Sequence, residues 1–209
     1  LLLGYYTAEG RTTSYYTQFI FGSHEEKLHN DSITLTRDIF NLEPHLEYTQ
    51  DNSLRITWHS KTLSDFFEKT CGNGSHNKHI PEFLWTLPKE YFLSYLEGFA
   101  KGDGYISKEG HLLISTVSRQ LAREIAWLSS MHGIGVSLCK KKNKAGRIIK
   151  NKPLPEGVYW TMKIAKTSYP FDKPAKSPSQ IKKPVVKKIV RKDYDGYVYD
   201  FCGCDNEGF

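Results

Sequence analysis

The sequence contains one short motif twice, and this repetition constrains the fold more than any other feature. The segments Leu2–Gly10 and Leu96–Gly104 align without a gap, and each reads as a helix that ends in an acid followed by glycine, which supplies the C-terminal turn. In each segment, two small residues lie four positions apart on one helix face, where they let another helix approach closely. Two such faces packed together would bring Glu9 and Asp103 to one end of a helix pair. The residues of this predicted helix interface are Gly4, Ala8, Gly98 and Gly102.

Strands and helices follow the two motifs in a similar order. In the first half we expect a strand at 14–21, a helix from Ser23 with Glu26 completing a capping box, an alternating strand at 54–59 and a short helix capped by Ser64. In the second half we expect a strand at 111–117, a helix capped by Ser118 and closed by Gly133, and strands at 134–138 and 158–164 on either side of a basic loop. Each half mixes helices with antiparallel strands, which predicts an α+β fold of two repeats related by a pseudo-twofold axis.

Changes in composition along the chain predict five segments. They are a first repeat at 1–76, a connector at 77–95, a second repeat at 96–169, a basic proline-rich linker at 170–192 and a final segment at 193–209. Pro88 in the connector marks the approach to the second motif helix. The prolines and lysines of the linker favour an extended chain over packed structure.

Charge is distributed unevenly along the sequence. Lys and Arg number 29 against 23 Asp and Glu, a net charge of +6. Residues 1–100 have 8 basic and 13 acidic side chains, a net charge of −5, whereas residues 101–209 have 21 and 10, a net charge of +11. This asymmetry indicates a polyanionic partner. Because no run of about 18 apolar residues is present, we expect no membrane partner, and the four scattered cysteines indicate free thiols.

Three blocks of residues resemble one known family. Leu3–Gly10 is similar to the aromatic-rich first motif of LAGLIDADG homing endonucleases from inteins, and residues 78–81, Lys-His-Ile-Pro, resemble the short block before their second motif. Asp193–Asp200, with Asp205 and Asn206, resembles the penultimate segment of an intein splicing domain. The chain thus resembles the monomeric, two-motif LAGLIDADG homing endonucleases embedded in archaeal inteins, and the blocks bracket nearly its whole length.

Two parts of the intein pattern are missing from this sequence. The N-terminal splicing block with its nucleophile is absent, and so is the terminal His-Asn pair used for asparagine cyclisation, so this chain is not expected to splice. Because it opens on Leu1 beside the first motif, we interpret it as an excised domain whose residues 193–209 are a remnant of the splicing domain.

The resemblance implies a fold, an activity and a cofactor. The fold is a pseudo-twofold duplicated LAGLIDADG fold of two αββαββα-like repeats, with antiparallel DNA-binding sheets. The activity is site-specific cleavage of double-stranded DNA by a monomer, in the cytoplasm of a prokaryote with access to chromosomal DNA. The cofactor is Mg²⁺, or Mn²⁺ in its place, since a hard divalent cation neutralises charge at a scissile phosphate.

The resemblance also implies a catalytic role for the acid that ends each motif. Glu9 and Asp103 would hold the metal, one acid from each repeat. An ordinary acid is unfavourable at a helix C-terminus, where the macrodipole is negative. Both repeats nevertheless place an acid there, which supports the metal-binding role over simple surface charge.

Two lysines complete the predicted catalytic set. Lys78 matches the family's lysine in the block before the second motif, and a basic group near each phosphate offsets charge in the transition state. For the second repeat we predict Lys163, on the polar face of a strand, while Lys140 and Lys166 remain alternatives.

The polar faces of the strands are the expected DNA-binding surface, because a two-stranded ribbon fits the major groove. The basic loop at 140–152 is expected to hold phosphates rather than read bases. The residues predicted to bind DNA are Arg55, Thr57, His59, His111, Ser115, Lys140, Lys141, Lys142, Lys144, Arg147, Tyr159 and Thr161. The four tryptophans lie on apolar faces and are expected in the core rather than on a stacking surface; they are Trp58, Trp85, Trp127 and Trp160.

Two other functions remain as alternatives. A catalytically silent member of the family would bind DNA or a structured intron RNA without cutting it, as maturase relatives do, although the intact acids of both motifs argue against this. A self-processing splicing element is nearly excluded by the missing nucleophile and terminal asparagine.

Overall fold

The computed structural model describes residues 1–143, 148–149, 152–153, 156–165, 189–191, 193 and 195–197. The chain divides into two compact units, Leu1–Ser179 and Gln180–Phe209. Every helix and strand among the described residues belongs to the first unit. In the described part of the chain, no helix is both long and apolar enough to cross a membrane.

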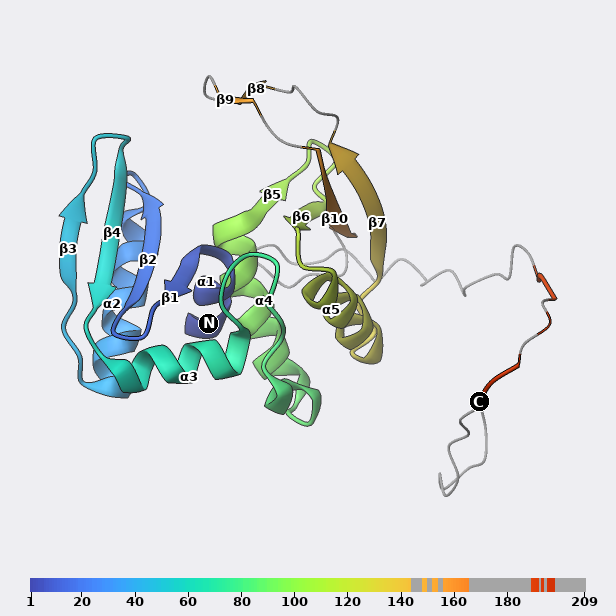
Figure 1. Cartoon of the computed structure of the whole chain (residues 1–209), viewed down its shortest axis with the longest axis horizontal. Helices are drawn as coiled ribbons and strands as arrows, with labels where there is room; N and C mark the ends of the chain where they lie inside the picture. The colour runs from blue at the N-terminus through green and yellow to red at the C-terminus, as the bar shows by residue number, and fades with distance from the viewer. Residues whose placement is uncertain are drawn as a thin grey trace. The chain divides into compact units, whose positions relative to one another are not determined.

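The first repeat is an αββαββα unit. Its elements are α1 (Leu2–Glu9), β1 (Gly10–Thr12), β2 (Thr17–Gly22), α2 (Glu26–Phe40), β3 (His45–Tyr48), β4 (Ser53–Trp58) and α3 (Lys61–Cys71). The strands form an antiparallel sheet in the order β1-β2-β4-β3, and α1 passes directly into its first strand (Figure 1).

The second repeat follows the same plan. After a short 3₁₀ helix, η1 (Glu82–Trp85), come α4 (Lys89–Asp103), β5 (Gly104–Ile106), β6 (Leu112–Thr116), α5 (Arg119–Met131), β7 (Val136–Asn143) and β10 (Gly157–Ile164). The sheet order β5-β6-β10-β7 matches that of repeat one, and β8 (Ile148–Ile149) pairs with β9 (Lys152–Pro153) between its last two strands in sequence. The predicted duplicated α+β fold with antiparallel sheets is therefore confirmed. Helix α4 begins inside the range expected for the connector.

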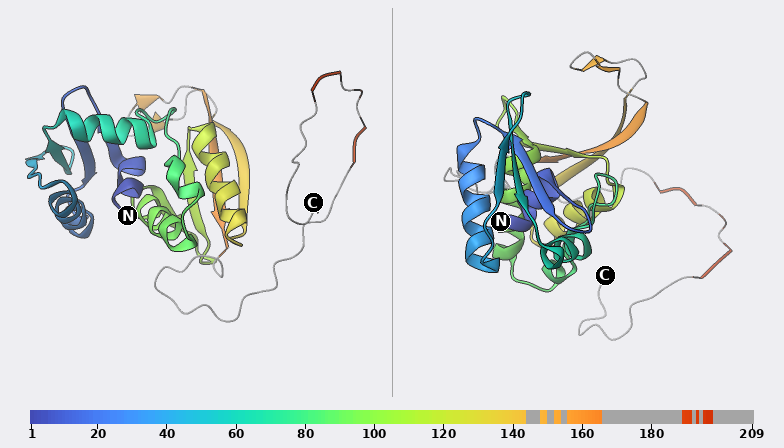
Figure 2. Two further views of the ribbon diagram at one scale, coloured as in Figure 1. Left: turned by 90° about the horizontal axis from the view of Figure 1, so that it is seen from below. Right: turned by 60° about the vertical axis from the view of Figure 1, so that its left-hand side comes forward.

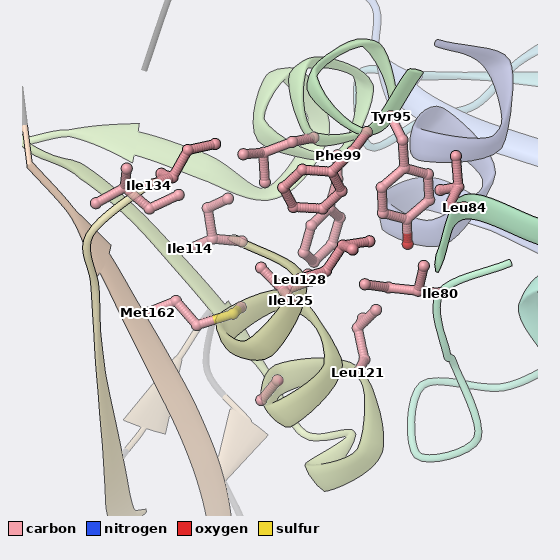
Figure 3. Packing of buried hydrophobic residues seen from close by; sticks show 14 of the residues in the cluster. Ile80, Leu84, Tyr95, Phe99, Ile114, Leu121, Ile125, Leu128, Ile134 and Met162 are labelled. Carbon is pink, nitrogen blue, oxygen red and sulfur yellow. The ribbon is translucent and has the colours of Figure 1, made fainter. Parts of the chain in front are cut away.

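The cores of the two repeats differ in kind. In repeat one, aromatic rings pack on each other: Tyr6 stacks on Phe67 with ring centroids 4.4 Å apart, and Phe19 meets Trp58 edge-on at 5.2 Å. In repeat two, aliphatic side chains of β6, α5 and β10 fill most of the core beneath the aromatic side chains of α4 (Figure 3). Trp127 is 68% exposed, so the expectation of a core position is wrong for this residue.

Two of the three predicted serine caps are wrong. Helix α2 begins at Glu26 without a side-chain cap, and the Glu25 carboxylate instead accepts a hydrogen bond from the Gly22 amide at 2.6 Å. Helix α3 begins a turn earlier than expected, because the Ser60 hydroxyl accepts a bond from the Leu63 amide at 3.2 Å and leaves Ser64 inside the helix. In α5, the predicted cap, Ser118, accepts a bond from the amide three residues on.

The glycines after the two acids do not serve a left-handed turn, contrary to expectation. Gly10 has φ −92° and Gly104 has φ −90°, an extended backbone that leads straight into β1 and β5. A Cβ on Gly10 would collide with Tyr6, and one on Gly104 would collide with the carbonyl oxygen of Ala100. These positions therefore need glycine for lack of space.

Candidate functional site

Helices α1 and α4 pack against each other with their backbones in contact, between the two four-stranded sheets (Figure 2). A Cβ on Gly4 would collide with the carbonyl oxygen of Tyr95 and lie 2.6 Å from the Phe99 amide nitrogen. A Cβ on Gly98 would collide with the carbonyl oxygen of Leu1 and lie 3.1 Å from the Gly4 Cα. The small residues of the two motifs thus meet at the boundary between the repeats.

The same packing brings the two acids together. A Cβ on Gly102 would meet the Ala8 side chain and lie 3.3 Å from the Glu9 Cγ, so the last turns of α1 and α4 adjoin. Burial, the neighbouring Asp103 charge and the Glu25 charge together raise the pKa of Glu9 to about 7. Burial also raises the pKa of Asp103 to about 6, against a lowering by Lys78. The result is a carboxylate pair with one carboxyl from each repeat, in which Glu9 is half-buried and Asp103 is exposed.

Lys78 lies behind this pair, at the C-terminus of α1. Its side chain is only 4% exposed, and its ammonium donates hydrogen bonds to the carbonyls of Tyr6 at 2.7 Å and Gly10 at 2.9 Å. The Nζ also lies 3.3 Å from the centroid of the Tyr6 ring. Burial lowers the pKa of Lys78 to about 7, and Asp103 is among the groups that raise it. Lys78 therefore caps the negative end of α1 and acts electrostatically on Asp103.

Both repeats hold the segment that carries Lys78. The amide of His79 donates to the carbonyl of Cys71 at the end of α3 at 3.0 Å. From α5, the Ser118 hydroxyl donates to the Lys78 carbonyl at 2.6 Å, and the Glu124 carboxylate accepts a bond from the Ile80 amide at 2.8 Å. The sequence carried no signal for Glu124, because its partner lies 44 residues away.

Lys163 lies in β10 with an exposed side chain. The pairing of the strands shows that Lys163 occupies the position in the second sheet that Thr57 occupies in the first sheet. Among the described residues, the lysine whose charge acts on Asp103 is Lys78. Lys166, an alternative for the second lysine, is outside the described residues.

The carboxylate pair suits a divalent cation shared with a phosphate. Within the described ranges there is no group of three or more His, Cys, Asp and Glu side chains that could hold a metal. Mg²⁺ is usually held by one or two carboxylates, with water and phosphate oxygens completing its shell. Glu9 and Asp103 are two like charges at negative helix ends, and a cation would relieve their repulsion. The donors present therefore fit a hard cation that needs a phosphate ligand.

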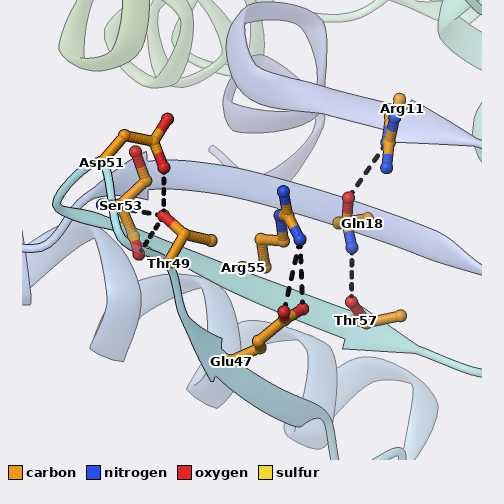
Figure 4. A network of polar contacts seen from close by, with 8 residues as sticks. All are labelled: Arg11, Gln18, Glu47, Thr49, Asp51, Ser53, Arg55 and Thr57. Carbon is orange, nitrogen blue, oxygen red and sulfur yellow. Dashed lines mark hydrogen bonds and ion pairs between the residues drawn. The ribbon is translucent and has the colours of Figure 1, made fainter.

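In repeat one, the predicted DNA-binding residues belong to a polar network on the open face of the sheet (Figure 4). The Gln18 amide donates to the Thr57 hydroxyl at 2.8 Å, and Arg11 donates to the Gln18 carbonyl oxygen at 3.0 Å. Arg55 donates to the Glu47 carboxylate at 3.3 Å.

His59 lies beyond the end of β4, exposed, with its ring edge-on to Tyr16. The sequence analysis did not single out Arg11 and Gln18. They join the network because strand pairing places Arg11 opposite Gln18 and Gln18 opposite Thr57.

In repeat two, the predicted polar face is present on β6 and β10. The Ser115 and Thr161 hydroxyls lie 3.2 Å apart, and Tyr159 is on the same face of β10 as Thr161. His111 precedes β6, in the turn after β5, where its amide donates to the Ser107 hydroxyl at 3.2 Å.

The predicted basic loop begins later than expected. Strand β7 runs to Asn143, so Lys140, Lys141 and Lys142 are strand residues that alternate between the two faces of the sheet. Lys141 pairs with Tyr159 on the open face, whereas the Lys140 ammonium lies 5.9 Å from the centroid of the Trp160 ring on the other. Local periodicity failed here because exposed lysines hide the strand pattern. Lys144 and Arg147 lie outside the described residues.

No protein-family model matches the chain. Its whole length is similar to part of the DNA polymerase of Thermococcus kodakarensis, with 29% identity over 248 residues, and it spans only 15% of that protein. An uncharacterized protein of Methanocaldococcus jannaschii, MJ1054, is 28% identical over 232 residues, covering 95% of this chain and 26% of its own. A glutamine–fructose-6-phosphate aminotransferase of the same organism is 32% identical over 114 residues, which cover 53% of this chain and 10% of the aminotransferase. Similar segments within proteins of unrelated activity are typical of an inserted element.

Solved structures share the fold. The homing endonuclease I-DmoI superimposes with a TM-score of 0.54 and 11% identity, over 78% of this chain and 86% of that one. WhiA from Thermotoga maritima gives a TM-score of 0.50 and 16% identity, over 78% of this chain and 48% of that one. The paired motifs and these solved structures agree, and the chain has the LAGLIDADG fold, duplicated within one chain.

Proposed function

We propose that the chain is a metal-dependent endonuclease that cleaves double-stranded DNA at a specific site. The observation that carries this proposal is the pair of carboxylates, Glu9 and Asp103, one from each repeat, at the adjoining ends of α1 and α4. A duplex has two strands to cut, and a composite site with one acid per repeat suits that task. The I-DmoI relative has been solved in complex with DNA and Ca, and with DNA and Mn, which supports a duplex partner and a divalent ion for the fold.

Hydrolysis joins a water oxygen to phosphorus and breaks the bond from phosphorus to a sugar oxygen. Glu9 and Asp103 would hold a divalent cation between the repeats. Such an ion neutralises charge on the phosphate and makes its bound water a better nucleophile. Packing of α1 on α4 keeps the two carboxylates close despite their repulsion, which prepares the site before DNA arrives.

Lys78 has a positioning role in this proposal. Its ammonium is engaged by two carbonyls and the Tyr6 ring and is nearly inaccessible, so it does not contact the duplex. Its charge lowers the pKa of Asp103 and so favours the ionised form that binds metal. For repeat two, Lys163 remains the proposed lysine near DNA, since its side chain is exposed on β10.

The duplex would lie against the open faces of the two sheets. In repeat one, Arg55 and Thr57 belong to an ordered polar network, which suits base reading. In repeat two, Lys141 beside Tyr159 suits phosphate contacts. We propose that one copy of the chain covers both halves of its site, because the pseudo-twofold fold supplies both sheets, and that it acts on chromosomal DNA in a prokaryotic cytoplasm.

A selection for cleaved sites tests this proposal, because the target is unknown. The chain is incubated with a randomised duplex library and Mg²⁺ or Mn²⁺, and cleaved ends are sequenced. We expect one enriched site, whose cleavage Asp103→Asn and Glu9→Gln each slow by at least about 100-fold, the usual cost of losing a group that stabilises transition-state charge. Glu97→Gln is the matched control, since Glu97 is an exposed acid of α4 paired with Lys101. Failure of the folded chain to enrich any site, with either ion, would contradict the proposal.

A silent nucleic-acid-binding module is the second candidate. It is favoured by the buried Lys78, whose ammonium is engaged by the carbonyls of Tyr6 and Gly10. Specific retention of one duplex or intron RNA without strand breaks in Mg²⁺ or Mn²⁺ would support it over the endonuclease.

A further inference from the structure

A groove of about 540 Å³ lies beside α5, apart from the carboxylate pair and the open sheet faces. Its walls come from His76 after the end of α3, from η1 and from the exposed side of α5. The lining residues are His76, Trp85, Arg119, Gln120, Arg123, Glu124 and Trp127. The volume falls in the range of small-molecule sites, roughly 300–1,000 Å³.

Aromatic and guanidinium groups share one side of α5 at this groove. Arg119, Arg123 and Trp127 are spaced four residues apart, so they form one stripe along the helix. All three side chains are exposed, and Trp127 is 68% exposed. Trp85 provides a second indole from η1. Such a large exposed ring beside a concave surface is typical of a recognition site.

The charges of the groove favour an anion. Among the described residues, neither arginine takes part in an ion pair. The one carboxylate of the lining, Glu124, already accepts hydrogen bonds from the Ile80 amide and from the Gln120 side chain. Arg119 also occupies the first turn of α5, where the helix dipole is positive and repels a cation. An anionic ligand would offset that repulsion.

We propose that this groove binds one nucleotide unit, with its base stacked on Trp127 or Trp85 and its phosphate on Arg119 and Arg123. Indole faces stack on any base, and guanidinium groups bind phosphate oxygens in pairs. The nucleotide is either free or part of a single strand, since both present the same base and phosphate. A duplex does not fit this chemistry, because its bases are stacked on each other. The site is therefore additional to the proposed cleavage site.

Titration of the full chain tests the proposal. Adenosine monophosphate and a 5′-phosphorylated single-stranded oligonucleotide are added separately, and binding is followed by tryptophan fluorescence and calorimetry. We expect saturable binding, weakened at least about tenfold by Arg119→Ala/Arg123→Ala and by Trp127→Ala, whose exposed positions tolerate alanine. The matched control is Lys61→Ala/Lys69→Ala, which removes two positive charges from exposed positions of α3 and should leave binding unchanged.

The outcomes separate the two sources of the ligand. Equal affinity for both probes identifies a free nucleotide, and at least tenfold tighter binding of the oligonucleotide identifies a single strand. The proposal is overturned if neither probe saturates at about 1 mM, the weak limit of useful affinity, or if the control loses as much affinity as the arginine variant. It is also overturned if duplex DNA alone binds. Thermal melting confirms that each variant is folded, and cleavage activity has no part in the readout.

Discussion

The two repeats have the same backbone plan but different polar surfaces. In each, a motif helix ends in an acid, a glycine follows, and the first strand pairs with its neighbour from that glycine onward. On the open face of repeat one, Arg55 and Thr57 are engaged by neighbouring side chains. On repeat two, Lys141 and Lys163 are exposed strand residues. The same backbone plan therefore carries an ordered polar network in repeat one and exposed positive charge in repeat two.

The carboxylates are unequal in the same way. Among the described residues, the charges that act on the pKa of Glu9 are those of the acids Asp103 and Glu25, whereas the pKa of Asp103 is lowered by Lys78. The compensating lysine is fastened to α1 of repeat one by its two carbonyl bonds. A duplicated fold therefore does not require the same side chains in both repeats. Here Lys78, a residue of the connector, lowers the pKa of Asp103 at the boundary between the repeats.

Replacement of Lys78 should have the largest effect of the substitutions considered, on both the unfolding free energy and the cleavage rate. Lys78→Met leaves the carbonyls of Tyr6 and Gly10 without their donor, which costs about 1–3 kcal/mol for each buried group. We expect a large loss of unfolding free energy by denaturant titration, and a cleavage rate lowered at least about 100-fold on the selected site. Lys101→Met is the control, because Lys101 is a half-exposed lysine with an ion pair to Glu97, and its loss should cost less than about 1 kcal/mol. Equal losses of unfolding free energy and cleavage rate in the two variants would contradict a positioning role for Lys78.

Enlargement of the helix boundary should separate the repeats. Gly98→Ala places a Cβ against the Leu1 carbonyl and the Gly4 backbone, and we expect a loss of about 1–3 kcal/mol in unfolding free energy. Gly157→Ala provides the control, since a Cβ there meets nothing within 4 Å. A fully stable Gly98→Ala protein would contradict close packing of α1 on α4.

Neutralisation of either Glu9 or Asp103 should stabilise the metal-free protein, and we expect the two substitutions to differ in the size of the gain. The folded pKa of Glu9 is raised from 4.5 to about 7, so its charged form disfavours folding above pH 7, and the penalty disappears as pH falls below 4.5. Glu9→Gln should therefore gain about 1–2 kcal/mol at pH 8, a range that discounts the shift for solvent screening.

Asp103→Asn should gain less than Glu9→Gln, because it also removes the charge that favours protonated Lys78. Thermal melting in EDTA at pH 8 and pH 4 measures both variants. A larger stability gain for Asp103→Asn than for Glu9→Gln, or a gain that persists at pH 4, would contradict the prediction that the Glu9 charge costs the fold more than the Asp103 charge.

The smallest expected effect distinguishes the two faces of β7. Lys141→Ala should flatten the log–log salt dependence of DNA binding by about 0.9, the slope for one phosphate contact. Lys140→Ala should change it less, because Lys140 lies over Trp160 on the other face. Binding measured over a salt series tests this order, and equal slopes for the two variants would show that strand register does not decide phosphate contact.

Sequence reasoning found the features that depend on local spacing. Small residues four apart and an acid before glycine located α1 and α4, and Ser118 was identified as a cap because an apolar stripe follows it. It misplaced the start of α3, since Ser60 and Ser64 both precede apolar residues and only the end of β4 selects between them. It also ended β7 too early, because pairing with β10, rather than its own lysines, keeps the strand extended to Asn143.

The sequence by itself determined the duplication, the α+β class and the meeting of the two acids, because each follows from periodicity and from the absence of side chains at the helix boundary. Only the tertiary structure decided how those acids are charged. Burial at the packed ends of α1 and α4 raises the pKa of both, and Lys78, brought back from the connector, offsets that rise at Asp103. Burial and long-range hydrogen bonds join residues that are far apart in the chain, so no local pattern can encode them. For the same reason the groove beside α5 was invisible in the sequence, where Trp127 reads as a core residue.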